Sequence, residues 1–345
     1  MSVENVAPSS GCSTAVTIFS VFGIVFTLLK AKSLAQFLYN NYLAKGTKLT
    51  VYGAKQGAWA VVTGATDGIG KEYAIQLATS GFNIVLVSRT QEKLTALAQE
   101  LETVAKIQTR TIALDYSKAN KVSFEKVTEE LKDLPITVLI NNVGQSHVMP
   151  TSFEETPETE MDNIMHINCF GTLHTTKAIL PIMTEQRRKD KKGPRCLILT
   201  MGSFAGLIPS PYLSTYAGSK AFLSNWSASM AEEVKPEGID VWCYNSYLVV
   251  SSMSKIRRPN FTTPTPKAFV REALGSINVQ RGGSAPYISQ PYPSHAIMSW
   301  SLEELLGSVK YLVVNQVAAM HLDVRKRALK KQARIQQSVS TQTSV

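Results

Sequence analysis

Residues that hold metals and disulfides are scarce in this 345-residue sequence. Its four cysteines lie far apart with no C-x-x-C pair, and its five histidines form no pair at a metal-ligand spacing. Neither a zinc site nor a disulfide framework is therefore indicated. We expect no metal, and reduced thiols in a part of the protein that faces the cytosol.

Acidic residues are fewer than basic ones, and the basic excess is not spread evenly. Lysine and arginine outnumber aspartate and glutamate by 36 to 26, a formal net charge of +10. The basic residues gather mainly at 187–195, 255–258 and 325–334. No aromatic-interleaved binding motif accompanies them, which argues against nucleic acid as a partner. Anionic lipid headgroups or a phosphate-bearing substrate fit such clusters better, and ordinary solvated loops are the alternative.

Charge is absent altogether from Asn5 to Leu29, and residues 15–29 (AVTIFSVFGIVFTLL) are strongly apolar. A membrane-spanning helix needs about 20 residues. Gly11 to Leu29 provides nineteen, which suits a thin bilayer such as that of the endoplasmic reticulum. A cleaved signal peptide would need a basic start, whereas the only charge before the run is Glu4, and no small-residue cleavage site follows. We therefore predict a retained transmembrane helix within an N-terminal anchor and linker, residues 1–50.

Lysines follow this run closely, at positions 30, 32, 45 and 48. Positive charge on one flank of a membrane helix favours the cytosolic side for that flank. We therefore expect a single-pass protein of the endoplasmic reticulum membrane whose catalytic domain is cytosolic.

Glycines cluster after the next apolar run, in Trp59-Ala-Val-Val-Thr-Gly-Ala-Thr-Asp-Gly-Ile-Gly-Lys71. The pattern predicts a strand, a glycine-rich turn and a helix. Such a turn lets the backbone approach a pyrophosphate at the helix N-terminus, where free N–H groups and the helix dipole favour anions. The spacing G-x-x-x-G-x-G differs from the G-x-G-x-x-G of most dinucleotide-binding folds and from the P-loop. The expected cofactor contacts in this stretch are Gly64, Thr66, Asp67, Gly68, Ile69 and Gly70.

The second strand expected in this half covers residues 83–87 and leads into Ser88 and Arg89. In dinucleotide-binding folds, a carboxylate at this place binds the ribose 2′-hydroxyl of NAD. In this sequence a hydroxyl and a guanidinium take the place of that carboxylate, and these groups suit a 2′-phosphate. The sequence therefore predicts NADPH as the cofactor, with Arg89 as a contact.

Further apolar runs at 111–115, 138–144, 196–201 and 241–247 alternate with polar or amphipathic segments of helical length. This alternation predicts an α/β fold, a doubly wound parallel sheet with helices on both faces. Ligands of such sheets bind at the carboxyl ends of the strands. The residues that fall at those ends, and that we expect in one cleft, are Asp115, Asn142, Ser203 and Ser251.

A tyrosine and a lysine stand four residues apart in Tyr216-Ala-Gly-Ser-Lys220. Positions i and i+4 share one face of a helix, and an ammonium beside a phenol lowers its pKa from about 10. Ser203 ends an apolar run from which its hydroxyl could reach the same point. The three side chains together predict a site that polarises a carbonyl, and hence an oxidoreductase. A half-buried aromatic residue and a solvated lysine are the alternative interpretation of the pair alone.

Four motifs in this order and spacing resemble the short-chain dehydrogenase/reductase family: Thr63-Gly-Ala-Thr-Asp-Gly-Ile-Gly70, Asn141-Asn-Val-Gly144, Ser203 and Tyr216-x-x-x-Lys220. The resemblance covers about residues 51–258 and implies an NADP-binding catalytic domain of the Rossmann type over 51–260.

The resemblance also implies a role for each matching residue. Tyr216 would donate a proton to the ketone oxygen, Lys220 would lower the tyrosine pKa and hold the nicotinamide ribose, and Ser203 would bind the carbonyl. Asn168 would hold a water of the proton relay, with a purely structural hydrogen-bonding role as the alternative. Asp115 resembles the family's adenine contact and Asn142 the residue that borders the cofactor.

One stretch departs from the family pattern. Relatives carry Pro-Gly after the sixth strand, whereas this chain has Ser246-Tyr-Leu-Val-Val-Ser251. The loop that contacts the nicotinamide must therefore be shaped by bulkier residues, and Val249 and Ser251 are the contacts expected there.

Within the family, the apolar N-terminus, Asn-Asn-Val-Gly-Gln-Ser, Met-Gly-Ser-Phe-Ala-Gly-Leu-Ile-Pro and Ser-Lys-Ile-Arg-Arg resemble a fungal microsomal branch. That branch reduces very-long-chain 3-oxoacyl-CoA during fatty-acid elongation. The resemblance implies this substrate, NADPH, the lipid bilayer, and an elongase, a dehydratase and an enoyl reductase as partners. A membrane-bound 17β-hydroxysteroid dehydrogenase and a non-catalytic NADPH-binding scaffold are the alternatives.

The family motifs end near residue 260, and we expect a C-terminal extension over 261–345. Apolar residues recur at helical spacing between positions 302 and 320, which predicts one amphipathic helix that packs on the core or lies in the membrane interface. A basic tail follows at 325–334, and the uncharged, polar residues 336–345 are expected to be disordered.

Overall fold

The computed structural model describes residues 10–304, 306 and 310–343. By internal contacts the chain divides into two units, Met1–Ala44 and Lys45–Val345. The three-part division expected from the sequence stays a prediction.

The first unit is a long helix, α1 (Ser10–Leu38), which continues into a π-helical turn, η1 (Tyr39–Leu43). Among the described residues, one stretch is long and apolar enough to cross a membrane, Thr14–Leu43, with a mean hydropathy of 1.9. Apolar side chains between Val16 and Leu29 are exposed to the surroundings, and the Thr27 hydroxyl is satisfied within the helix by donating to the Gly23 carbonyl, at 2.8 Å. The helix is longer than predicted because Lys30 and Lys32 are good helix formers and do not end it.

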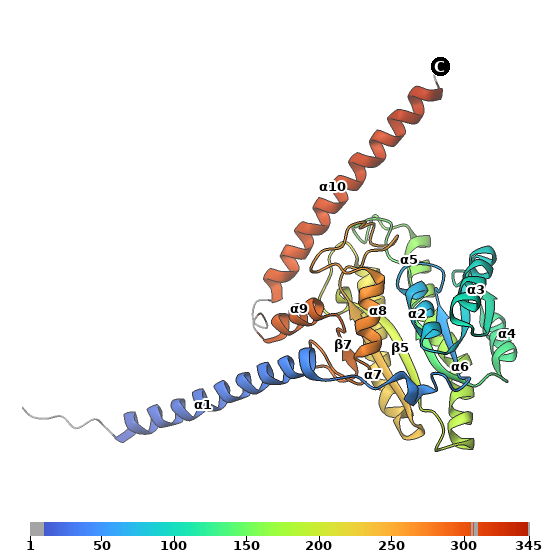
Figure 1. Cartoon of the computed structure of the whole chain (residues 1–345). Helices are drawn as coiled ribbons and strands as arrows, with labels where there is room; N and C mark the ends of the chain where they lie inside the picture. The colour runs from blue at the N-terminus through green and yellow to red at the C-terminus, as the bar shows by residue number, and fades with distance from the viewer. Residues whose placement is uncertain (1–9, 305, 307–309, 344–345) are drawn as a thin grey trace, which may run out of the picture. The chain divides into compact units, whose positions relative to one another are not determined.

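The second unit is built on a seven-stranded parallel sheet in the order β3-β2-β1-β4-β5-β6-β7. The predicted doubly wound α/β fold is confirmed (Figure 1). Strands β2 and β3 follow one another on one side of β1, and strands β4 to β7 follow one another on its other side. The strand order therefore reverses between β1 and β4. The strands are β1 Trp59–Thr63, β2 Asn83–Ser88, β3 Thr109–Ala113, β4 Ile136–Asn141, β5 Cys196–Ser203, β6 Ile239–Ser246 and β7 Ile288–Ser289.

Helices cover both faces of this sheet because alternate strand residues point to opposite sides. Ala60 and Val62 of β1 join a core cluster with α2, α3 and α8, whereas Trp59 and Val61 join a second cluster with α4, α6 and α7. Burial on both faces explains why the strands read as continuous apolar runs. The helices are α2 Gly68–Thr79, α3 Gln91–Ala105, α4 Lys121–Leu131, α5 Glu158–Met165, α6 Gly171–Lys189, α7 Ser214–Val234, α8 Pro266–Gly275, α9 Pro293–Glu304 and α10 Lys310–Thr343.

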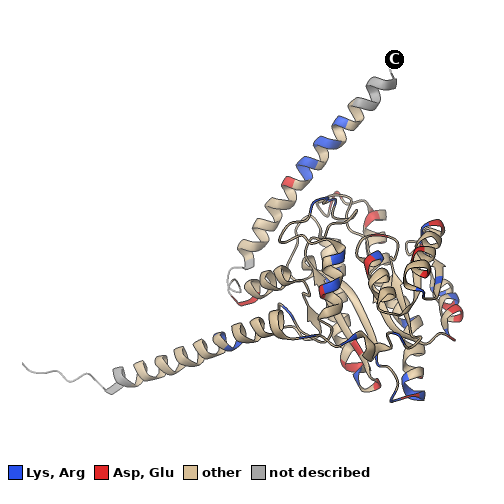
Figure 2. Ribbon diagram, in the orientation of Figure 1, with Lys and Arg blue, Asp and Glu red and all other residues tan. Residues whose placement is uncertain are grey.

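The C-terminal extension differs from the sequence prediction in two respects. The single helix expected over 302–320 is wrong, because α9 ends at Glu304, Leu306 lies in a bend, and α10 begins at Lys310. The apolar positions 305 and 309 of the predicted stripe lie outside the described residues. Disorder was expected over 336–345, but α10 continues to Thr343, and residues 344–345 lie outside the described residues. Lysines and arginines lie along the middle of α10 (Figure 2).

The basic cluster at 187–195 is largely used inside the protein. Arg187 donates to the main-chain carbonyls of Asp190, Lys191, Gly193 and Pro194, which it gathers around the end of α6. Arg188 pairs with Glu237, and Arg195 pairs with Asp240. Neither of the partners expected from the sequence, anionic lipid or substrate phosphate, is needed to explain these three arginines.

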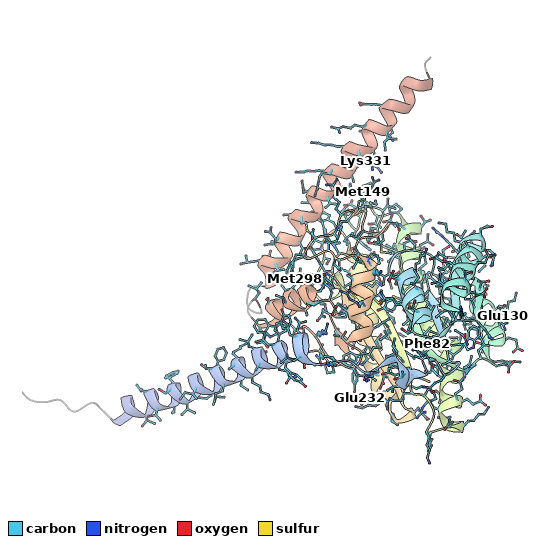
Figure 3. The ribbon with its side chains drawn as sticks, viewed as in Figure 1. Phe82, Glu130, Met149, Glu232, Met298 and Lys331 are labelled. Atoms are coloured by element: carbon cyan, nitrogen blue, oxygen red, sulfur yellow. The ribbon has the colours of Figure 1, made fainter. Side chains whose placement is uncertain are left out.

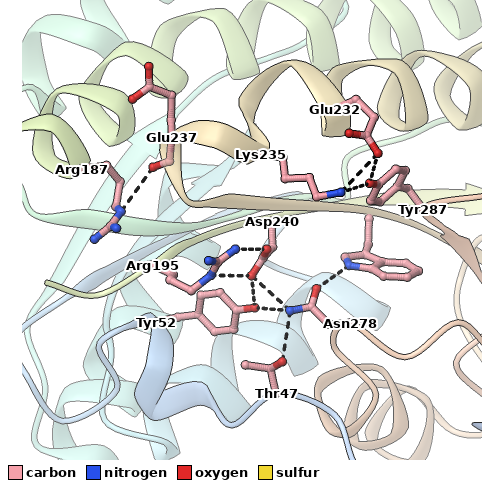
Figure 4. Close-up of polar contacts among 11 residues, drawn as sticks. Thr47, Tyr52, Arg187, Arg195, Glu232, Lys235, Glu237, Asp240, Asn278 and Tyr287 are labelled. Atoms are coloured by element: carbon pink, nitrogen blue, oxygen red, sulfur yellow. Dashed lines mark hydrogen bonds and ion pairs between the residues drawn. The ribbon is translucent and has the colours of Figure 1, made fainter. Parts of the chain in front are cut away.

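Asp240 in β6 is the centre of a polar network that holds the start of this unit to the sheet (Figure 4). Its carboxylate accepts hydrogen bonds from the Tyr52 hydroxyl at 2.6 Å, from the Arg195 guanidinium and from the Asn278 amide at 3.1 Å. Asn278 also donates to the Thr47 hydroxyl at 3.1 Å. Tyr52 is fully buried, and burial and the Asp240 hydrogen bond both raise the pKa of its phenol, so it stays neutral.

We expect Asp240→Ala to destabilise the protein by about 1–3 kcal/mol, because it leaves the buried Tyr52 hydroxyl without its charged acceptor. Thermal unfolding of the full chain in detergent, followed by tryptophan fluorescence, measures the loss. Glu237→Ala is the matched control, since Glu237 only pairs with the exposed Arg188, and such surface pairs contribute little. Equal unfolding temperatures for the two variants would contradict the role given to the network.

Candidate functional site

The glycine-rich turn between β1 and α2 forms the first part of the site. Gly64 has φ 64°, a left-handed conformation that other residues adopt only with strain. A Cβ on Gly70 would lie 2.2 Å from the Gly64 oxygen and 2.4 Å from the Asn142 amide nitrogen. The first turn of α2 can therefore approach the end of β1 only because both residues are glycine.

Asn142 lies at this turn, as predicted, but its side chain already has protein partners. Its amide nitrogen donates to the carbonyl of Thr63 at 3.0 Å, and the Thr63 hydroxyl accepts from the main-chain N–H groups of Asn142 and Val143. These bonds tie the end of β4 to the end of β1. Asn142 thus borders the expected cofactor position while it fixes the backbone there.

The loop that follows β6 lies against the start of α2. Asp67 caps this helix by accepting from the Gly68 N–H at 2.7 Å, and its second carboxylate oxygen accepts from the Ser252 hydroxyl. A Cβ on Gly68 would lie 3.6 Å from the Ser251 Cβ. An open cavity of about 330 Å³ lies between the two segments, lined by Asp67, Gly68, Lys71, Glu72, Ile75, Val250, Ser251, Thr265, Pro266 and Lys267.

A larger cavity, of about 530 Å³, lies at the opposite ends of the strands and is lined by Trp59, Arg110 and Leu134 among others. Ligands of doubly wound sheets bind at the carboxyl ends, and this larger cavity contains none of the predicted site residues. We therefore assign the site to the smaller one and the residues around it.

The ends of β2 and β3 bring Arg89 and Asp115 near each other. Arg89 is exposed directly after β2, where the Ser88 hydroxyl lies 2.8 Å from that of Thr66. Asp115 accepts hydrogen bonds from the hydroxyl and the N–H of Ser117. These bonds lower the pKa of the Asp115 carboxyl, and the charges of Lys118 and Arg89 lower it by smaller amounts. The Arg89 cation and the hydrogen-bonded Asp115 carboxylate thus lie where the adenosine part of a dinucleotide would bind.

Ser203 and Tyr216 meet at the carboxyl end of β5. Ser203 is the last residue of that strand, and its oxygen accepts from the Ala205 N–H at 3.2 Å. Tyr216 lies in the first turn of α7, close to Ser203. The two hydroxyl groups therefore lie at the same end of β5, and their shared catalytic role stays a prediction.

Lys220 lies one turn further along α7 and is buried. Its ammonium lies 5.9 Å from the centre of the Tyr216 ring and donates to the Met201 carbonyl at 2.8 Å. Burial lowers the pKa of Lys220 to about 8. Burial also raises the pKa of Tyr216, and the nearby Ser203 hydroxyl partly opposes that rise. The lowering of the tyrosine pKa by Lys220 stays a prediction.

Asn168 is fully buried in a π-helical turn, η3 (His166–Phe170), which joins α5 to α6. Its amide oxygen accepts from the Gln145 N–H at 2.7 Å, and its nitrogen donates to the Gln145 carbonyl and the Ser219 hydroxyl. The amide thus joins the segment after β4 to α7, which supports the structural role held open as the alternative. The helix propensities of the residues do not predict the π turn, although such turns are frequent at functional sites.

The loop after β6 is held by contacts that the sequence did not indicate. Val249 is buried in the core cluster and is not among the residues that line the cavity, whereas Ser251 lines it near the glycine-rich turn. Their expected contacts with the nicotinamide stay predictions. The Tyr247 N–H donates to His295 of α9 at 3.3 Å, and the other ring nitrogen of His295 contacts the Thr262 carbonyl at 3.0 Å. His295 has no sequence signature for this role, because nothing in the spacing of the histidines connects it with this loop.

Residues 58–260 match the family described as short chain dehydrogenase. The chain is 73% identical over 336 residues to a very-long-chain 3-oxoacyl-CoA reductase of Schizosaccharomyces pombe, covering 97% of this chain and 98% of that protein. It is 47% identical over 317 residues to a protein of the same name from Podospora anserina, covering 92% and 91%.

Solved structures agree in fold. A 7beta-hydroxysteroid dehydrogenase has a TM-score of 0.62 at 20% identity, covering 76% of this chain and 97% of its own. A short-chain dehydrogenase from Sphingobium yanoikuyae in complex with NADPH has a TM-score of 0.60 at 22% identity, covering 74% and 95%. The family match covers more than half of the sequence, and this protein therefore belongs to the short chain dehydrogenase family.

Proposed function

We propose that this protein reduces very-long-chain 3-oxoacyl-CoA to 3-hydroxyacyl-CoA with NADPH. The observation that carries the proposal is the site formed by Ser203, Tyr216 and Lys220 in a chain that is 73% identical, along nearly its full length, to a reductase named for that substrate. A non-catalytic scaffold would have no chemical need for the three side chains.

The proposed reaction adds a hydride to C3 of the substrate and a proton to the C3 oxygen. Tyr216 donates the proton from its hydroxyl, and Ser203 donates a hydrogen bond to the same oxygen. Both groups thereby stabilise the negative charge that develops there. Lys220 holds a positive charge beside the phenolate that remains, and at a pKa of about 8 it exchanges protons readily near neutral pH. A bound reduced nicotinamide supplies the hydride.

The residues in and around the cavity suit the parts of a dinucleotide. The N-terminus of α2 and the close-packed glycine turn provide the place for a pyrophosphate, and Arg89 provides a cation for a 2′-phosphate. Asp115 would contact the adenine, and Ser251 of the loop after β6 lies near enough to the turn to face the cofactor.

The N-terminal helix supports a membrane-bound enzyme. We place it in the endoplasmic reticulum as a single-pass protein with a cytosolic catalytic domain, because lysines follow the apolar stretch. In that position it would meet acyl chains at the bilayer and the other enzymes of fatty-acid elongation.

Tyr216→Phe should lower the turnover of a long-chain 3-oxoacyl-CoA by about 10²–10⁴-fold, because only the proton donor is lost. NADPH oxidation by the detergent-solubilised enzyme measures turnover, and quenching of protein fluorescence should show that NADPH still binds. Tyr287→Phe is the matched control, since its hydroxyl contacts only Glu232 and Lys235 on the surface. Full activity of Tyr216→Phe would refute the mechanism, and turnover of a 17-ketosteroid alone would refute the substrate.

Arg89→Glu should raise the KM for NADPH by about 10-fold or more and leave that for NADH nearly unchanged, because it replaces a cation near the 2′-phosphate by an anion. Initial rates with each cofactor check this. Arg110→Glu makes the same charge reversal at an exposed strand position and should change neither constant. An unaltered preference for NADPH would show that another residue recognises the phosphate.

The topology can be tested by glycosylation in microsomes. Two sequons, Asn225-Trp-Ser and Asn260-Phe-Thr, should stay unmodified, whereas a sequon in a tag added before Met1 should be modified. A glycosidase-sensitive shift on a gel detects either event. A shift of the untagged protein would place the catalytic domain in the lumen.

A further inference from the structure

Two irregular segments lie beside the proposed catalytic residues. Residues 145–157 follow β4 and begin at Gln145, which Asn168 holds by two hydrogen bonds. Residues 207–213 lie between Ser203 and Tyr216. One main-chain bond, from the Thr151 N–H to the Tyr212 carbonyl at 2.8 Å, joins the segments.

The chain returns to both segments with α10, 110 residues after Pro211 and 175 residues after Pro150. His321 is 9% exposed, and its Nδ1 lies 2.6 Å from the Pro211 carbonyl oxygen. One turn further on, Arg325 donates from Nη1 to the Pro150 carbonyl at 3.2 Å and from Nη2 to the Glu155 carboxylate at 2.9 Å. Each segment is thus held by one side chain of the same helix.

These bonds hold a segment whose backbone conformation is unfavourable at one residue. Tyr212 has φ 68°, which is unfavourable for a bulky residue and persists only where its surroundings fix it. The His321 bond to Pro211 and the Thr151 bond to Tyr212 fix the residue from both sides. Because Tyr216 follows four residues later, the position of this segment sets the shape of the space beside the catalytic hydroxyl.

Valines precede His321 and Arg325 on the same face of α10. Val313, Val317 and His321 are spaced at i, i+4 and i+8, so they follow one face of the helix for about 12 Å. These valines are only partly buried, and the basic residues Lys326, Arg327 and Lys330 lie on the opposite, exposed face. Figure 3 labels Met149, next to Pro150, and Lys331 on the exposed part of the helix.

We propose that α10 forms one side of the acyl-chain site, and that His321 and Arg325 are positioning residues that hold segments 145–157 and 207–213 for long acyl chains. The inference rests on the proposed function and adds a determinant of chain length to it. A short substrate needs only the carbonyl site at Ser203 and Tyr216, whereas a long chain continues along the segments and the valines of α10.

The test compares a short substrate, acetoacetyl-CoA, with a long one, 3-oxooctadecanoyl-CoA, on the full-length enzyme in detergent. His321→Ala and Arg325→Ala should each raise the KM for the long substrate by about 10-fold, with kcat and the KM for the short substrate within about twofold of the wild type. His321→Asn keeps an N–H donor near the position of Nδ1 and should restore most of the affinity. Arg327→Ala is the matched control, because Arg327 pairs only with Asp323 on the exposed face.

Hydrogen exchange of peptides from 145–157 and 207–213 provides a second measurement that does not depend on activity. Exchange should be faster in His321→Ala and Arg325→Ala, and unchanged in His321→Asn and Arg327→Ala. An unchanged KM for the long substrate, or an equal rise for both substrates, would overturn the proposal. If the wild type reduced neither thioester, the proposed function would fail, and unchanged exchange would then refute the positioning role separately.

Discussion

The close approach of α2 to the end of β1 is the constraint on which the rest of the site depends. Gly70 packs against Gly64 and the amide of Asn142 at distances that exclude any side chain. Asn142 in turn binds the backbone of Thr63, so the ends of β1 and β4 cannot move independently. Two residues later, Gly144 passes near both Asn168 and Lys220, where an added Cβ would lie 3.3 and 3.4 Å from their polar atoms. The proposed cofactor and catalytic parts are therefore one continuous packed structure.

Burial sets the chemistry of that structure. An ammonium in a dry environment loses hydration, which is why the pKa of Lys220 falls to about 8 although the Met201 carbonyl accepts from it. The same effect keeps the Tyr216 phenol protonated. A neutral phenol close to Ser203 can donate a proton, and a lysine near its titration point can respond to the loss of that proton. These are the states of an acid and a cation that the proposed reduction requires.

The sequence predicted the features that depend on local periodicity. Apolar runs and glycine spacing located the parallel sheet and the turn at Gly64, and the i, i+4 spacing placed Tyr216 and Lys220 on one helix face. It did not predict features that depend on tertiary contacts. The π turn at Asn168 is stabilised by bonds to Gln145 and Ser219, which lie 23 and 51 residues away. The end of α9 at Glu304 was missed because the apolar spacing continues across it, and Arg187 looked like a surface charge because its carbonyl partners have no sequence signature.

The loop after β6 shows how residues of the C-terminal extension hold a segment that contains no proline. A proline there would restrict the backbone through its fixed φ, but this chain has Tyr247, Leu248 and Val249 instead. His295, outside the matched region, accepts from the Tyr247 N–H at Nδ1 and donates from Nε2 to the Thr262 carbonyl. Only the neutral imidazole can do both, and burial lowers the pKa of His295 to about 4, so that form prevails at neutral pH. A buried hydrogen-bonded side chain thus restrains this loop without the covalent ring of a proline, so a helix far along the chain helps to set the position of the segment after β6.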